Sequence, residues 1–264
     1  IYFTGPYLDG KPPSFQPSIV VESAADAEAA VQKLKDAQVS YVKVQSRLRP
    51  DAYFAIADAA RRHDLRFVGH VPDTVSASAA SDAGQYSIEH LTGVLLATSS
   101  REEELRGRLL TNMPNQTAEQ AHARMQTWIH DLLKTQSAEK SGELYRKFAT
   151  NGTWNVPTLV LLKNLAYLTP ETRAAQDWRE KYLPAAEREI WQRGIRDCFA
   201  GEDGNSFAQR AELMAKSIDV VRGMHDAGAP LMAGTDTSAP NVYPGFSLHE
   251  ELALLVRAGL TPME

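Results

Sequence analysis

The sequence predicts an α/β fold in which helices connect the strands of a parallel sheet. Strand-like runs of β-branched and aromatic residues, such as 39–44, alternate with segments whose apolar residues recur at helical spacing, such as 23–37. The early strand signals lie about 20–30 residues apart, which leaves room for a crossover helix between neighbours. The chain has no internal repeat beyond this rhythm and no low-complexity linker, so we expect a single domain over residues 1–264.

The composition is that of an ordinary globular protein. Hydrophobic residues make up 43% of the 264 positions and charged residues 23%. A net charge of -5 gives no basic excess for binding nucleic acid or an anionic membrane surface. No apolar run reaches the ~18 residues of a membrane span. Cys198 is the single cysteine, which excludes an internal disulfide framework and a cysteine-rich metal site.

Six segments are expected to be strands of one sheet. The first is followed by a loop at 6–18 that is rich in proline, glycine and serine. Ser23 caps the helix at 23–37, and further helices at 51–63 and 74–83 separate the next strands. The expected strands are 1–5, 39–44, 66–71, 86–91, 154–160 and 230–236.

The second half of the chain is mainly helical. Two long helical insertions are expected, at about 100–150 and 170–227, and a last helix at 247–258 that ends at Gly259. On the active face of the sheet, the insertions would form a lid that sets substrate size. Elsewhere they would only thicken the outer ring of helices.

Four side chains with metal or acid–base chemistry come near the ends of four different predicted strands: Lys43, His70, His90 and Asp236. The carboxyl ends of parallel strands converge on one face, where such folds keep their chemistry. Two imidazoles, a carboxylate and a further oxygen donor suit Zn²⁺ or a similar divalent cation. Each residue alone also fits a structural role, but four in order favour a common site.

Lys43 is the exception in this set, because an ammonium group cannot bind a metal. Carboxylation of its amine by CO₂ would convert it into an anionic ligand with two oxygens. Its valine neighbours, Val42 and Val44, would otherwise place a charge among buried apolar residues.

With these residues in place, the chain resembles the metal-dependent amidohydrolase superfamily. Within it, the chain is most similar to the branch of imidazolonepropionase-like proteins and binuclear Xaa-Pro dipeptidases (prolidases). The likeness extends over nearly the whole chain. The stretches that carry it are Tyr41-Val42-Lys43-Val44, Val68-Gly69-His70-Val71-Pro72, Ser87-Ile88-Glu89-His90-Leu91, Ala233-Gly234-Thr235-Asp236 and Pro244-Gly245-Phe246-Ser247-Leu248-His249-Glu250-Glu251-Leu252.

The resemblance implies a TIM-like (β/α)8 barrel and a centre of two metal ions, with Zn the expected metal. It makes Lys43 the carboxylated bridging ligand and His70 and His90 the ligands of one metal. Asp236 becomes a ligand of the other metal and the group that transfers the proton. Tyr243 and His249 follow in the same region and are candidates for contact with substrate.

The chain departs from the family's pattern in one respect. The family has a His-x-His pair at the end of its first strand, and no His-x-His occurs in these 264 residues. We therefore expect strands 3–8 only, truncated at both ends, with an incomplete metal site and little activity in this fragment alone. A homo-oligomer or a complementing fragment is the expected partner, and the compartment stays open between cytoplasmic and exported.

The leading functional hypothesis is hydrolysis of an amide C–N bond, in a dipeptide or an N-acyl amino acid, by metal-activated water. A mononuclear hydrolase of cyclic amides, or a deaminase, is the alternative within the same class. A non-catalytic barrel remnant that serves in binding or assembly is the alternative from another class. The residues do not identify the substrate, because loops around a fixed site set specificity.

Overall fold

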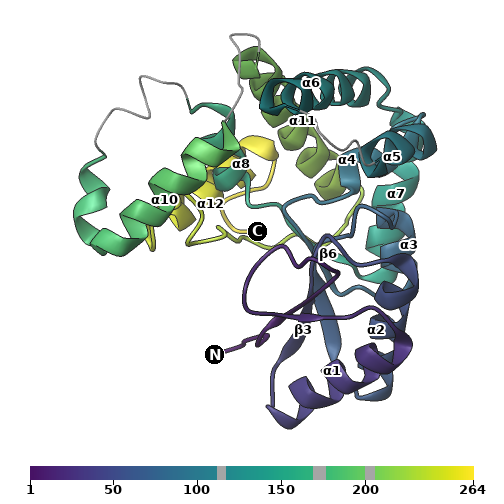
Figure 1. Cartoon of the computed structure of the whole chain (residues 1–264). Coiled ribbons are helices and arrows are strands. Elements are labelled where there is room, and N and C mark those ends of the chain that lie inside the picture. Colours follow the sequence, from purple (N-terminus) through teal and green to yellow (C-terminus); the bar gives the residue numbers. More distant parts are fainter. Residues whose placement is uncertain (112–116, 169–176, 200–205) are drawn as a thin grey trace. The chain divides into compact units, whose positions relative to one another are not determined.

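The computed structural model describes residues 1–111, 117–168, 177–199 and 206–264 (Figure 1). The chain divides into two compact units. The first consists of 1–111, 136–157 and 223–232, and the second of 112–135, 158–222 and 233–264. The single domain expected over 1–264 stays a prediction.

The first unit contains a six-stranded, fully parallel sheet with the order β2-β1-β3-β4-β5-β6. This result confirms the predicted α/β class. The sheet has short strands that place the carboxyl ends of β3, β4 and β5 side by side. The strands are β1 (Tyr7–Asp9), β2 (Ser18–Val20), β3 (Tyr41–Val44), β4 (Arg66–Gly69), β5 (Ser87–Glu89) and β6 (Trp154–Val156).

The first two strands of the sheet differ from the prediction. Residues 1–5 form no strand; Gly5 has a φ of 69° and Pro6 has no N–H to donate to a ladder. The segment 6–18, predicted as a loop, supplies β1 and the start of β2 instead. Three-residue strands among prolines and glycines carry too little pattern to be read from the sequence.

The last two predicted strands are also shorter than expected. After Val156 the chain turns at Pro157 and Thr158 and enters a helix, so 154–160 is a strand only in its first half. The segment 230–236 contributes a single parallel bridge, Leu231 opposite Asn155. Pro230 lacks an N–H, which limits any longer ladder.

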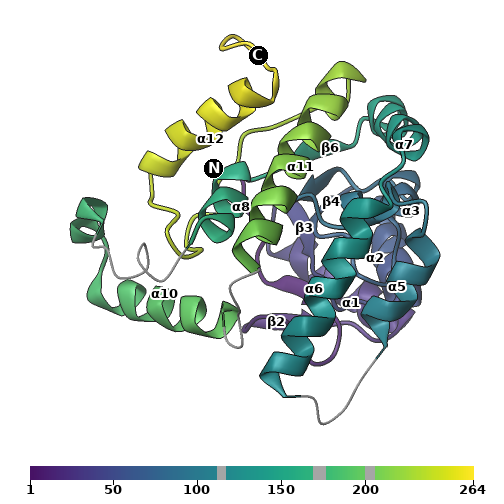
Figure 2. The ribbon, with the colours of Figure 1, turned by 90° about the horizontal axis from the view of Figure 1, so that it is seen from above.

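Helices cover the sheet of the first unit (Figures 1 and 2). Ser23 caps α1 by accepting a hydrogen bond from the N–H of Asp26 at 3.1 Å. Leu8, Val42 and Ile88 are fully buried beneath these helices. The helices of this unit are α1 (Ala24–Asp36), α2 (Pro50–Arg62), α3 (Ala77–Asp82), α4 (Val94–Ala97), α5 (Glu102–Leu110) and α7 (Ala138–Asn151).

The second unit is helical in its described residues. Its α8 and α12 pack together, and Glu251 of α12 is fully buried at that contact. The last turn of α11 belongs to the first unit. Parts of the two predicted insertions, at 112–116, 170–176 and 200–205, lie outside the described residues. The elements are α6 (Ala118–Lys134), α8 (Leu159–Ala166), the 3₁₀ helix η1 (Trp178–Tyr182), α10 (Ala185–Cys198), α11 (Ser206–Asp226) and α12 (Phe246–Ala258).

None of the helices in the described residues combines the length and the apolar character needed to cross a bilayer.

Candidate active site

Lys43, His70 and His90 gather at the carboxyl edge of the sheet in the first unit. Lys43 lies in β3 opposite Val68, His70 follows β4 directly, and His90 follows β5 directly. The imidazole rings of His70 and His90 are 5.0 Å apart between centroids and meet edge to face. Parallel neighbours thus bring together two side chains that are 20 positions apart in the sequence.

His70 is held as a neutral imidazole. Burial, together with the charges of His90 and Lys43, lowers the pKa of His70 to about 3. Its Nδ1 shares a hydrogen bond of 2.8 Å with the hydroxyl of Ser46. In the tautomer whose Nδ1–H donates to this hydroxyl, the lone pair of Nε2 is available to a cation.

Lys43 forms an ion pair with Glu89 at 2.5 Å, and both side chains are less than one-fifth exposed. The Lys43 ammonium also lies 5.4 Å from the centre of the Tyr7 ring. A cavity of about 700 Å³ opens beside the pair, lined largely by residues 2–7 and by Gln16 and Pro17. The sequence reading missed Glu89 and Ser46. Glu89 stood beside His90 at a strand end, which was a usable signal, whereas Ser46 had none.

The loop after His70 is tied to its surroundings by hydrogen bonds. The N–H of Val71 donates to the hydroxyl of Thr92 at 2.9 Å. Arg106 of α5 donates to the carbonyls of Asp73 and Val75, at 2.9 and 2.8 Å. One guanidinium thus fixes the backbone that leads from the histidine to α3.

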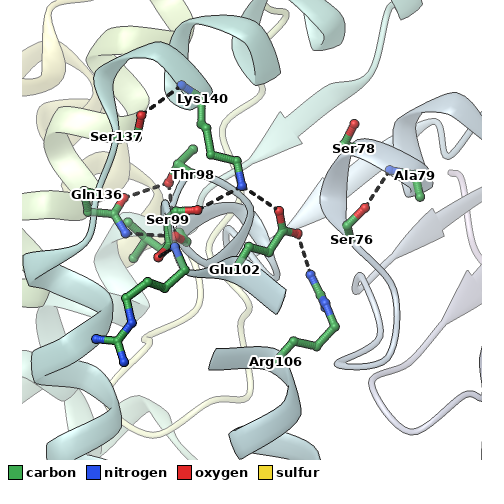
Figure 3. Close-up of polar contacts among 12 residues, drawn as sticks. Ser76, Ser78, Ala79, Thr98, Ser99, Glu102, Arg106, Gln136, Ser137 and Lys140 are labelled. Carbon is green, nitrogen blue, oxygen red and sulfur yellow. Dashed lines mark hydrogen bonds and ion pairs between the residues drawn. The ribbon is translucent and has the colours of Figure 1, made fainter. Parts of the chain in front are cut away.

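Arg106 is itself positioned by an ion-pair network (Figure 3). Glu102 accepts from Arg106 at 2.7 Å and from Lys140 of α7 at 3.1 Å. Lys140 also donates to the carbonyl of Ser99 at 2.9 Å. The network links α5 and α7 to the loop that carries His70.

The other three predicted site residues lie in the second unit. Asp236 is exposed and has a φ of 56°, a conformation that aspartate tolerates better than most residues. Its carbonyl accepts the N–H of Ala239 at 3.0 Å. His249 is exposed on α12. Tyr243 is only 2% exposed, so its ring is mostly covered by protein.

The donor set fits a divalent cation in part. Two imidazoles at adjacent strand ends are suitable ligands in their neutral form. Lys43 is not a ligand while its ammonium is paired with Glu89. Among the residues that the structure describes, no group of three or more histidine, cysteine, aspartate or glutamate side chains is arranged to hold a metal. A site here would need the modified lysine or ligands from elsewhere.

Comparisons with known proteins agree with the fold. A bottromycin amidohydrolase matches 98% of this chain with a TM-score of 0.72 and 24% identity. A Bifidobacterium longum protein described as a prolidase matches with a TM-score of 0.57 and 18% identity over 98% of the chain. The A. niger ochratoxinase matches with a TM-score of 0.53 and 16% identity, also over 98%. No family model and no curated protein matches the sequence.

The chain spans about half the length of these solved structures, with coverage of 51%, 50% and 45%. The predicted resemblance is therefore confirmed as a structural match to amidohydrolase superfamily members. The six-stranded parallel sheet matches about half of amidohydrolase TIM-barrel structures. At these identities the likeness establishes the fold, and activity has to be argued from the residues.

Proposed function

We propose that this chain carries part of the active site of a metal-dependent hydrolase that cleaves an amide C–N bond. The substrate class proposed is a dipeptide or an N-acyl amino acid. The observation that supports it most is the pair of histidines, His70 and His90, at adjacent strand ends beside Lys43. A pair of this kind, on a fold shared with amidohydrolases, suits metal-assisted hydrolysis better than a structural role.

The proposed metal ligands are His70, His90, Lys43 and Asp236, with zinc as the expected metal. Bound divalent cations would lower the pKa of a water molecule and polarise the scissile carbonyl. Ser46 orients the His70 ring through Nδ1. Carboxylation of Lys43 would form an N–C bond with CO₂, release two protons and separate the side chain from Glu89.

Asp236 is the proposed proton carrier. Its carboxylate would accept a proton from the attacking water and deliver it to the leaving amine. Exposure of the side chain in the second unit leaves it accessible to substrate. The ligands that the His-x-His pair supplies in the family would have to come from a longer chain, a complementing fragment or a second copy.

Hydrolysis of a dipeptide panel tests this proposal. The protein, supplied with zinc, bicarbonate and the His-x-His segment as a longer chain or a complementing fragment, is assayed with the panel beside Asp236→Asn. Because an amide in place of the carboxylate cannot accept the proton, we expect Asp236→Asn to lower turnover about 10²–10⁴-fold. Metal content should stay largely intact, since the other three proposed ligands are unchanged. Asp226→Asn, an exposed change in α11, is the matched control. Equal turnover in Asp236→Asn and wild type would contradict the assignment.

A mononuclear hydrolase of cyclic amides, or a deaminase, is the second candidate. The ion pair between Lys43 and Glu89 favours it, because an ammonium held at 2.5 Å from a carboxylate is not a bridging ligand. A bicarbonate requirement for activity would support the binuclear enzyme. Full activity in Lys43→Met would support the mononuclear one.

A further inference from the structure

The second unit contains a cavity of about 560 Å³. This volume lies within the range of small-molecule sites. Residues of α8, η1 and α10 line it, together with Asn241 and Tyr243 from the segment before α12. None of these residues belongs to the histidine site of the first unit.

One wall of the cavity is aromatic and rigid. The rings of Trp191 and Tyr243 meet at 5.2 Å between centroids. The indole N–H of Trp191 donates to the carbonyl of Ser238 at 3.0 Å. Arg179 lies 4.2 Å above the Tyr243 ring. Such fixed aromatic surfaces suit an apolar ligand group, because little side-chain entropy is lost on binding.

Most charged groups around the cavity are already paired. Arg179 binds Asp177 at 2.7 Å, and Lys163 binds Glu250 at 2.6 Å. Arg188 and Glu180 differ. Among the described residues, neither has an ion-pair partner, and Arg188 makes one long hydrogen bond, 3.2 Å, to the carbonyl of Glu180. The Arg188 guanidinium and the Glu180 carboxylate thus both line the cavity without an ion-pair partner among the described residues.

Tyr243 adds a further donor. Its side chain is 2% exposed, and its hydroxyl has no hydrogen-bond partner within the part of the chain that the structure describes. Burial and the carboxylates of Asp177 and Glu180 raise the pKa of Tyr243 to about 12. The phenol therefore stays protonated at neutral pH and can donate to a ligand.

We propose that this cavity binds a zwitterionic α-amino acid with an apolar side chain. Arg188 takes the carboxylate and Glu180 the ammonium, while Trp191 and Ile195 pack against the side chain. The complementarity lies in the two opposite charges left unpaired beside an apolar wall. The inference goes beyond the proposed hydrolysis, since it uses none of the residues proposed to bind the metal or carry the proton.

Titration calorimetry with L-phenylalanine tests the ligand class. N-acetyl-L-phenylalanine lacks the ammonium, L-phenylalanine amide lacks the carboxylate, and glycine lacks the apolar group. Each of the three is expected to bind about tenfold more weakly or worse than L-phenylalanine. The proposal is overturned if L-phenylalanine does not bind, or if the amide or the acetyl derivative binds as tightly.

Four variants test the location. Arg188→Gln and Glu180→Gln should each weaken binding of L-phenylalanine about tenfold or more. The controls Arg193→Gln and Glu189→Gln remove the same charges from exposed positions of α10 and should leave binding unchanged. Equal effects in test and control variants would contradict the assignment. Circular dichroism establishes that all four are folded.

Two further measurements separate this site from the proposed metal centre. Binding of L-phenylalanine should survive treatment with EDTA and the change Lys43→Met, because the cavity uses neither metal nor lysine. Binding that is lost under both conditions would place the amino acid at the metal centre and overturn the inference. Binding that persists in a protein without hydrolase activity would support the inference and contradict only the proposed function.

Discussion

His70 illustrates how a few neighbours set the chemistry of one side chain. Burial, together with neighbours that include the Lys43 ammonium, lowers its pKa to about 3, so the ring is neutral at any physiological pH. The hydroxyl of Ser46 fixes one ring nitrogen. In the tautomer that keeps its proton on Nδ1, this neutral imidazole offers Nε2 to a cation.

Removing Ser46 tests this role. In Ser46→Ala, Nδ1 loses its partner, so we expect zinc affinity to fall about 10–100-fold, the usual effect of losing a hydrogen bond to a ligating histidine. Competition with a chromophoric chelator measures the affinity. Ser78→Ala, which removes a hydroxyl that binds Lys147 elsewhere in the same unit, is the control. Equal affinities in the two variants would contradict the role.

Glu251 is a second residue whose environment decides its properties. It is fully buried, and burial raises its pKa to about 7. One carboxylate oxygen accepts the N–H of Val160 at 2.6 Å, while the other has no partner among the described residues. The folded protein therefore binds a proton more tightly than the unfolded chain, whose glutamate titrates near 4.3.

This shift predicts how stability depends on pH. Between about pH 4.3 and 7 the native state holds the extra proton, so the contribution of Glu251 to stability falls as pH rises through this window. At pH 8 we expect Glu251→Gln to be about 1–3 kcal/mol more stable than wild type, and to lose that advantage at pH 5. Urea unfolding at both values is the measurement, with exposed Glu119→Gln as control. A constant difference at the two pH values would refute the explanation.

At the scale of elements, the site depends on contacts between helices and loops. The strand ends supply Lys43, His70 and His90, but α5 and α7 hold the loop after His70 through Arg106, Glu102 and Lys140. Buried guanidinium groups with several acceptors are costly to remove, because each acceptor is left unpaired.

Arg106→Met tests this contribution. The variant keeps the bulk of the side chain but leaves the carbonyls of Asp73 and Val75 without their donor, so we expect a loss of about 2–4 kcal/mol in unfolding free energy. Hydrogen exchange should show faster opening at residues 71–76. Arg108→Met lies on the same helix with a more exposed side chain, which is 34% accessible, and should change stability by less than about 1 kcal/mol. Similar losses in the two variants would rule out a specific role for Arg106.

The elements with strong local patterns were predictable. β3 and β4 follow from their β-branched and aromatic residues, and α1 from Ser23 and its apolar spacing. β1 and β2 were not predictable, because each is a three-residue strand in a proline-rich stretch. Three residues are too few to show the alternation of apolar and polar side chains that marks a strand. The segment 230–236 was predicted as a strand but pairs only at Leu231, with Asn155. Local sequence does not reveal this, because the two residues are far apart in the chain.

At the scale of the whole chain, the four proposed metal ligands belong to two different compact units. Lys43, His70 and His90 belong to the first, whereas Asp236 belongs to the second. The sequence predicted which residue types stand at the strand ends. It did not predict that Lys43 is paired with Glu89, because that contact joins two strands and depends on register. The chain also spans about half of the length of the structures that it matches.

The central claim is that His70 and His90 bind a divalent cation. The most direct test is the zinc content per chain after equilibration with zinc and gel filtration, compared with the double variant His70→Asn, His90→Asn. His122→Asn, His225→Asn serves as the matched control. We expect bound zinc, at fewer than two ions per chain, in wild type and control, and none in the double variant. Equal zinc in the double variant and wild type would contradict the account.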